Sequence, residues 1–381
     1  NPMKPKRTMK TEVASWIILL LFLLMAVFWC SPMAAGNQEI NSPESQSKKR
    51  DIIVLPILYY KPETKIALGV GGLYYLKTAA QGAYTRPSNI FIAAVATQRK
   101  QFYIELKPDV YWNDDKYHLV GNFRVNKYVD KYFGIGSMAT SDDEETYSYR
   151  NLEIKLDFLR KFRSELSLGL QYALETYKIT EYDSEGELIN KKVSGSESGT
   201  ASGLGFIINW DSRDNIFSPG KGSFHQITAT LYDGIFGSDF EYLSLIYDAR
   251  KYVSLLPSHT LAFQIYSEFR TGNPSFRRLS LLGGEERMRG FYQGRYRDKN
   301  LLVFQVEYRI IPVVWRIGVA GFMAVGDVAD RLGGFDFGSF KYAGGFGIRY
   351  LWNREDKLNL RIDIAWGQDT SGFYITIKEA F

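Results

Sequence analysis

Sixteen consecutive residues, Gly283–Asp298 (GGEERMRGFYQGRYRD), concentrate side chains that can bind charge. They include four arginines, four glycines and three aromatic residues, and they lie between two segments with the pattern of β-strands. A guanidinium group presents its donors as a planar fork that suits a carboxylate. Glycine lets the backbone come close to another surface. The stretch therefore predicts a loop that binds acidic side chains at close range.

The sequence offers little for covalent or metal chemistry. Cys30 is the only cysteine, and His118, His225 and His259 are the only histidines. No HExxH or Gly-x-Ser-x-Gly pattern occurs, so neither a zinc protease nor an α/β-hydrolase is predicted. The acidic run 142–145 is interpreted as a solvated loop. We expect no enzymatic activity, no metal site and no cofactor.

The composition favours β-structure and excludes a nucleic-acid partner. Aromatic residues make up 15% of the chain, with 26 Tyr and 25 Phe, and such residues fit a pleated surface. The net charge is +5, but residues 1–36 hold four basic residues and one acid, which leaves +2 for the rest. A charge that small gives no electrostatic footprint for DNA or RNA.

The first 36 residues predict export. A basic patch precedes the apolar run Val13–Trp29, and Ala34–Gly36 provides small residues for cleavage, so residues 1–36 are interpreted as a signal peptide. An uncleaved anchor helix remains the alternative, because the run is long for a signal core. A lipoprotein signal at Cys30 is disfavoured, because the large Trp29 precedes it. Residues 37–50 are polar and predict a flexible periplasmic lead-in to a single domain, 51–381.

Hydrophobic alternation with a period of two recurs along that domain and predicts an all-β fold. It is clearest in residues 165–175, 302–310 and 358–366, where one face is apolar and the other mixes small and charged residues. A soluble sandwich would also alternate. The crowded polar face, the strand lengths and the export signal together favour a transmembrane antiparallel β-barrel with its apolar face outward.

Four short motifs resemble the BamA/TamA superfamily of outer-membrane barrels, also called the bacterial surface antigen family. They are Leu58–Thr64, Tyr132–Gly136, Trp210–Asp214 with Pro219 and Gly222, and Met288-Arg289-Gly290-Phe291. The resemblance implies a barrel of about sixteen strands in the outer membrane of a Gram-negative bacterium. It also implies that the loop carrying Met288–Phe291 folds back into the lumen, where glycines let its backbone meet the wall.

The resemblance further implies an acidic partner for Arg289 on a later strand, and Asp327 in Val325–Ala329 fits best. Parity places Asp327 on one face with Val319 and Val325, so either those valines point inward or a bulge intervenes. Two roles stay open for the pair, one that only pins a plug and one that takes part in movement.

The other motifs give structural expectations. Trp210–Gly222 predicts a tight turn, with Asp211 and Asp214 capping backbone donors beside Arg213, and with Pro219 and Gly222 shaping the backbone. Residues 37–50 are too few for the periplasmic repeat domains of about 75 residues that precede some family barrels. The chain is therefore expected to represent a short, barrel-only branch.

The seam between the first and last strands is the predicted functional edge. It involves Pro56 and Leu58 on one side and Ile375 and Phe381 on the other. Pro56 cannot donate to a ladder, so closure there should be weak, unless Pro56 precedes the strand. An edge offers unpaired backbone groups to an incoming strand. The aromatic end at Phe381 is typical of outer-membrane barrels, although Glu379 departs from that pattern.

The predicted function is insertion, assembly or translocation of a protein or lipid client, without covalent chemistry. A passive outer-membrane channel is the alternative, and a membrane-embedded hydrolase ranks last, because it needs a nucleophile and a base within reach. The expected partners are outer-membrane lipid and an unidentified protein or lipid client. A periplasmic partner or a second copy of the chain stays open.

Overall fold

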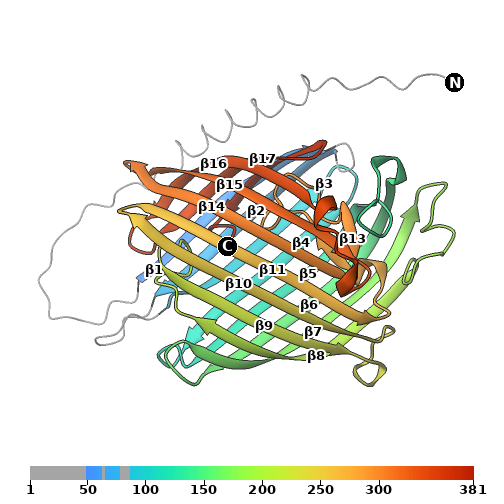
Figure 1. The fold of residues 1–381 in the computed structure, drawn as a ribbon, viewed down its shortest axis with the longest axis horizontal. Helices are drawn as coiled ribbons and strands as arrows, with labels where there is room; N and C mark the ends of the chain where they lie inside the picture. The colour runs from blue at the N-terminus through green and yellow to red at the C-terminus, as the bar shows by residue number, and fades with distance from the viewer. Residues whose placement is uncertain (1–48, 62–64, 78–85) are drawn as a thin grey trace, which may run out of the picture.

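The computed structural model describes residues 49–61, 65–77 and 86–381. Within these residues, sixteen strands form one antiparallel sheet in which each strand pairs with its neighbours in chain order. The sheet wraps into a barrel with strongly tilted strands (Figure 1). The prediction of an all-β, sixteen-stranded antiparallel barrel is confirmed.

The strands of the barrel are β1 (Lys49–Lys61), β2 (Lys65–Lys77), β3 (Ser88–Thr97), β4 (Phe102–Trp112), β5 (Tyr117–Tyr132), β6 (Glu145–Lys161), β7 (Leu166–Tyr182), β8 (Ser198–Asp211), β9 (Gly222–Tyr232), β10 (Tyr242–Leu256), β11 (His259–Gly272), β14 (Asn300–Val314), β15 (Ile317–Ala329), β16 (Lys341–Asn353), β17 (Leu358–Gly367) and β18 (Thr370–Ile377). A separate hairpin of β12 (Ser280–Leu282) and β13 (Tyr296–Asp298) lies in the connection between β11 and β14. The predicted signal peptide and residues 37–48 of the lead-in lie outside the described residues. The first strand already includes Lys49 and Arg50.

Short 3-10 helices occupy several connections, namely η1 (Ser141–Asp143), η2 (Gly234–Phe236), η3 (Phe276–Arg278), η4 (Leu332–Gly334) and η5 (Phe337–Ser339). Among the described residues, no helix is long and apolar enough to cross a bilayer. The connections 133–144, 183–197, 233–241, 273–299 and 330–340 all leave the same end of the barrel. We call it the long-loop end.

The alternation of side chains follows the predicted outward apolar face. In β7, Leu170 is 64% exposed, whereas Gln171 and Glu175 are buried on the opposite face. In β17, Ile364 and Trp366 are exposed, and their neighbour Asp363 is buried. Charged residues that are buried while apolar residues are exposed indicate a polar lumen inside a lipid-facing surface.

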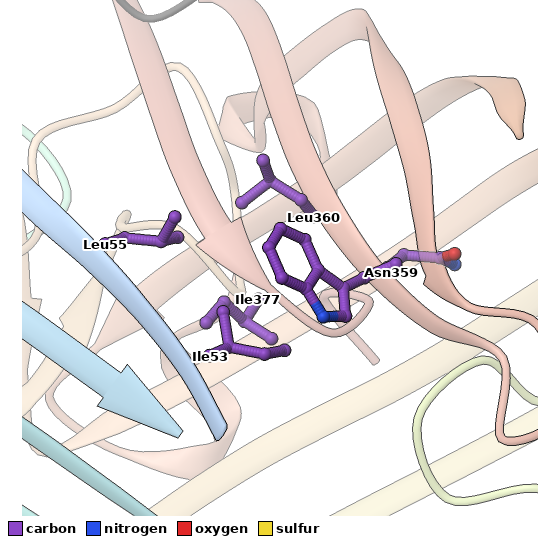
Figure 2. Close-up of a pocket in the computed structure, with 6 residues that line it drawn as sticks. Ile53, Leu55, Asn359, Leu360 and Ile377 are labelled. Carbon is purple, nitrogen blue, oxygen red and sulfur yellow. The ribbon is translucent and has the colours of Figure 1, made fainter. Parts of the chain in front are cut away.

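The two edge strands of the sheet, β1 and β18, meet at an apolar cluster, and we call this junction the seam. Ile53 of β1 and Leu358 of β17 are buried in the cluster, and Ile377 of β18 packs against it. Ile53, Leu55 and Ile377 also line one small pocket (Figure 2). Side-chain packing from both edges therefore brings the barrel together along this line.

Candidate functional site

The connection between β11 and β14, residues 273–299, folds into the barrel, and we call it the lumen loop. Its β12–β13 hairpin pairs Ser280 with Asp298, and the predicted motif Met288–Phe291 lies in the segment between the two hairpin strands. Arg289 is 2% exposed and Phe291 1%. The loop thus carries a cation out of bulk water, which requires acidic partners.

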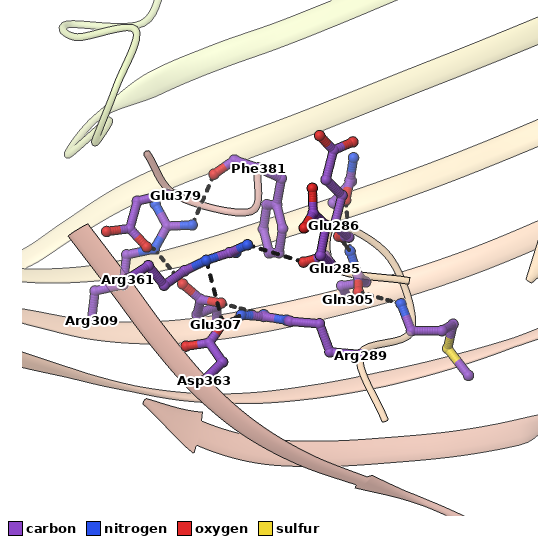
Figure 3. Close-up of polar contacts among 12 residues, drawn as sticks. Glu285, Glu286, Arg289, Gln305, Glu307, Arg309, Arg361, Asp363, Glu379 and Phe381 are labelled. Carbon is purple, nitrogen blue, oxygen red and sulfur yellow. Dashed lines mark hydrogen bonds and ion pairs between the residues drawn. The ribbon is translucent and has the colours of Figure 1, made fainter. Parts of the chain in front are cut away.

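Arg289 finds those partners on two wall strands. Its guanidinium donates to Asp363 of β17, with Nη1 and Oδ2 2.5 Å apart, and to Glu307 of β14. The guanidinium carbon also lies 3.5 Å from the ring centroid of Phe322. Figure 3 shows Arg289 reaching both carboxylates. Two carboxylates and one aromatic face therefore fix the motif arginine against the wall.

These groups belong to a larger seam-side charge cluster. We define it as Arg289, Arg309, Arg349, Arg361, Glu307, Asp363 and Glu379. Arg349 is the central cation, because it donates to Asp363 at 2.5 Å, to Glu379 at 2.9 Å and to Glu307 at 3.2 Å. Four arginines share three carboxylates, and all seven side chains are almost fully buried. Each carboxylate therefore faces at least two guanidinium groups at close range.

Asp327 is not the partner of Arg289, so that predicted pair is wrong. Asp327 instead accepts hydrogen bonds from Ser137 at 2.8 Å and Ser339 at 3.0 Å, and it pairs with Lys341 at 3.2 Å. Arg289 lies level with Phe322, five residues earlier on β15, which places Asp327 about 17 Å farther along the strand.

No β-bulge accounts for the position of Asp327 on β15. The β14–β15 ladder runs without a shift from Asn300↔Ala329 to Ile310↔Val319, and Val319 and Val325 are exposed. Pairing between β15 and β16 ends at Gly326, one residue before Asp327. The carboxylate thus meets its partners where β15 is paired with β14 alone, at the long-loop end.

The residues after Arg289 fit closely against β17 and β18. Gly290 has φ of 111°, and a Cβ on it would lie 2.8 Å from the backbone nitrogen of Gly367. Its own N–H donates to the hydroxyl of Tyr374 at 3.0 Å. A Cβ on Gly367 would in turn lie 2.6 Å from the ring of Phe291. Glycine is required on both surfaces, as the lumen-loop prediction expected for Gly290.

The start of the lumen loop is held by the opposite wall. The guanidinium carbon of Arg277 lies 3.8 Å from the ring centroid of Tyr149, and Arg277 pairs with Glu175 at 2.9 Å. Arg278 donates to the hydroxyl of Tyr232 at 2.9 Å. Burial alone would lower the pKa of Arg277, but Glu175 and nearby tyrosines raise the pKa well above its usual value. The loop therefore crosses the lumen and is anchored at both sides.

A second predicted motif, Tyr132–Gly136, contacts the same loop. The backbone N–H of Gly136 donates to the carbonyl of Arg297 at 2.8 Å, and Arg297 donates to the carbonyl of Lys131 at 2.9 Å. The guanidinium carbon of Arg295 lies 4.7 Å from the ring centroid of Phe133. Two motifs that are far apart in the sequence thus form one assembly in the lumen.

Comparison with known proteins places this arrangement in a family. The model of the Omp85 superfamily domain matches residues 74–381. The chain belongs to the Omp85 superfamily. It is therefore an outer-membrane β-barrel of that family, in keeping with the resemblance found in the motifs.

Several solved structures share the fold at low sequence identity. BamA from Haemophilus ducreyi lacking POTRA domains 1-3 matches with a TM-score of 0.54 and 11% identity, over 88% of this chain and 70% of that one. CdiB from Escherichia coli matches with a TM-score of 0.52 and 11% identity, over 88% of this chain and 62% of that one. CdiB from Acinetobacter baumannii matches with a TM-score of 0.50 and 11% identity, over 86% of this chain and 65% of that one. A comparison with curated proteins gave no match.

The Trp210–Gly222 motif forms a longer connection than the predicted tight turn. Residues 212–221 join β8 to β9, and Phe217 is 1% exposed, 5.9 Å from the ring of Tyr75 on β2. Asp214 accepts from the backbone of Gly220 at 2.8 Å. In this Omp85 barrel the connection therefore folds inward and packs beside the seam.

Ion pairs and backbone geometry fix the ends of this connection. Asp211 pairs with Arg213 at 2.8 Å and with Arg86 at 2.6 Å. Gly222 has φ of 101°, and a Cβ on it would lie 2.2 Å from the carbonyl oxygen of Ser212. Pro219 is buried in the connection. The motif residues thus hold the segment in place from both strands that it joins.

The seam residues are distributed differently from the prediction. Pro56 lies within β1, opposite Val70, and is exposed, so the alternative of a position before the strand is wrong. Leu58 pairs with Leu68 along the same ladder. Its side chain is not among those that the structure describes. Ile375 lies in β18, opposite Ile362. Phe381 is not part of the seam strand, because β18 ends at Ile377 and Phe381 is buried in the lumen.

Proposed function

We propose that this Omp85 barrel inserts or translocates a protein or lipid client at the outer membrane of a Gram-negative bacterium. The observation that carries the proposal is the buried link from Arg289 to β14 and β17, close to the seam. Edge strands offer backbone groups that an incoming strand can pair with, without reading much of its sequence. The seam is the candidate site of client contact.

A passive channel requires an open path through the lumen. The lumen loop crosses that path and is anchored by Arg277 on one wall and Arg289 on the other. Polar solutes could pass freely only if the loop were released from both walls. The crossing loop therefore supports a role at the barrel wall over a role as an open pore.

The proposed activity involves no covalent step. Barrels of this family are generally non-enzymatic. His118 pairs with Asp109 at 2.8 Å, and His225 and His259 bond the hydroxyls of Tyr247 and Tyr308. Each is a contact between neighbouring strands, as expected for residues that stabilise a sheet.

Photo-crosslinking in living cells tests this function. A photoreactive amino acid would replace Val54, which is 52% exposed on the outward face of β1 beside the seam. The matched control replaces Leu170, which is 64% exposed on β7, far from the seam in strand order. Mass spectrometry would identify the trapped molecules. We expect one defined client class at position 54 and only bulk lipid at position 170.

Two results would count against the proposal. Identical products at both positions would show that the seam has no special contact. Large, stable conductance of the purified barrel, unchanged when the lumen loop is shortened, would support the passive channel instead.

A further inference from the structure

The chain leaves the barrel wall after Ile377 and turns into the lumen. Lys378 has φ of 75°, a left-handed conformation that is uncommon for a residue with a side chain. Its backbone N–H still donates to the carbonyl of Asn359 at 2.9 Å. Because the turn uses a disfavoured backbone conformation, contacts of the following residues must hold it.

Glu379 supplies the first of these contacts. Its carboxylate accepts from Nε of Arg349 at 2.9 Å and from Nδ2 of Asn359 at 2.8 Å. Arg309 lies 3.7 Å from the same carboxylate. The Glu379 side chain is 1% exposed, and those of Arg309 and Arg349 are equally buried. The site around Glu379 is therefore a dry pocket that is complementary to one carboxylate.

Phe381 supplies the second contact, two residues later. Together with Ala380 it packs against Tyr252 of β10 and Ala262 of β11, and it is 3% exposed. Arg309 donates to its carbonyl oxygen at 2.8 Å, and the guanidinium carbon lies 5.4 Å from its ring centroid. Figure 3 shows Glu379 and Phe381 meeting Arg309 and its neighbours. The wall thus recognises an acidic residue followed two positions later by an aromatic one.

The same segment also reaches the other side of the seam. Nζ of Lys378 donates to Oδ1 of Asn89 on β3 at 2.9 Å. The N–H of Glu379 donates to the carbonyl of Phe217, which packs in one cluster with Ile53 of β1. These contacts, with β3 and with the apolar cluster of β1, lie on one side of the seam. The contacts of Glu379 and Phe381 with β14, β16 and β17 lie on the other side. The segment 378–381 therefore spans the seam on its lumen side.

We propose that Lys378–Phe381 is a latch that fills a docking site for an incoming polypeptide segment of the same chemistry, an acidic residue two positions before an aromatic one. This inference rests on the proposed function and names the chemistry of the client segment. Simple loss of the latch would leave buried Arg309 and Arg349 without the carboxylate of Glu379, which is costly. Exchange for a segment that brings its own carboxylate avoids this cost. The exchange removes the contacts that span the seam.

Peptide binding to the purified full-length barrel tests the proposal. The probe is a fluorescent peptide with the sequence of residues 374–381, YITIKEAF, amidated so that its end adds no charge. The tethered latch competes at high effective concentration in the natural chain. The variant Glu379→Lys expels it, because the new ammonium faces Arg309 and Arg349. We expect the variant to bind the peptide at least about tenfold more tightly than the natural chain.

The chain offers matched controls. Glu185→Lys makes the same charge change at an exposed residue of the connection 183–197 and should bind like the natural chain. A peptide with Gln at the position of Glu379 should bind the Glu379→Lys barrel about tenfold more weakly, because it loses a charged acceptor. Phe381→Ser weakens the latch through the aromatic contact, so it provides a second barrel if Glu379→Lys does not fold. Folding is checked by heat-modified migration in gels.

The outcomes separate this proposal from the proposed function. Equal binding by the natural chain and both folded latch variants would overturn the docking site, as would equal binding of the Glu and Gln peptides. Neither measurement requires a cellular client. Conversely, a barrel that binds the peptide as expected but traps no client at Val54 in cells would leave the docking site in place and contradict the proposed function.

Discussion

Arg289 in the lumen loop donates to Asp363 on the next-to-last strand of the barrel, with Nη1 and Oδ2 2.5 Å apart and both side chains almost fully buried. Through Arg349 the same aspartate is linked to Glu379 beyond the last strand. A continuous series of buried ion pairs thus connects the lumen loop to the barrel wall and to the latch, Lys378–Phe381. A change at any member is expected to affect the seam.

Arg289→Ala should lower the free energy of unfolding by about 3 kcal/mol, the lower part of the range for breaking a buried ion pair. The loss is moderated because Glu307 keeps Arg309 at 2.7 Å and Asp363 keeps Arg349 at 2.5 Å. Urea unfolding in lipid vesicles, followed by tryptophan fluorescence, would measure it. Arg331→Ala is the control, because Arg331 is 80% exposed and should cost less than about 0.5 kcal/mol. A change at Arg289 as small as the control would show that the buried pairing is absent.

Double-mutant cycles should identify the partner of Arg289. Arg289→Ala combined with Asp363→Asn should cost less than the sum of the single changes, by about 0.5–3 kcal/mol, because both remove one interaction. Combined with Asp327→Asn, the effects should add within about 0.5 kcal/mol, because Asp327 bonds Lys341 and Ser137 instead. Coupling to Asp327 but not to Asp363 would restore the pair expected from the sequence.

Much of the barrel could be predicted from local pattern. Alternation has the period of a strand and fixes which face is apolar, so Leu170 outward and Glu175 inward follow from the sequence. The charges within the strands further indicate that the polar face is the enclosed one. The arginines and glycines of the lumen loop predicted close contact with acidic side chains, and the position of the loop in the lumen was implied by the family resemblance of Met288–Phe291.

The partners within the lumen were not predictable in the same way. Glu307 and Asp363 each alternate with apolar residues, and nothing local distinguishes them from other inward acids. Choosing among them requires the stagger of distant strands and the depth that the loop reaches. The turn of Glu379 into the lumen depends on Arg309 and Arg349, 70 and 30 residues earlier in the chain. Its departure from the expected alternation was the only available signal.

Either anchor of the lumen loop should be sufficient by itself to keep the pore blocked. Arg277→Ala or Arg289→Ala alone should leave single-channel conductance in planar bilayers low, because the other wall still holds the loop. The double variant should show larger and noisier conductance, since a loop without buried ion pairs samples the lumen. Full opening by either single variant would mean that one anchor alone keeps the loop in place.

A covalent tether across the seam gives the most direct check on client contact. Ile53 and Ile377 line one pocket between the edge strands, so Ile53→Cys with Ile377→Cys, in a chain with Cys30→Ser, should form a disulfide under oxidation. We expect the tether to suppress client crosslinking at Val54, and a reductant to restore it, because a closed seam offers no free edge. The control pair is Leu170→Cys with Phe206→Cys, which joins strands already paired in the sheet. If the tethered barrel is folded and still traps its client at Val54, client contact does not require the seam to open, and the proposed role of the free edge is wrong.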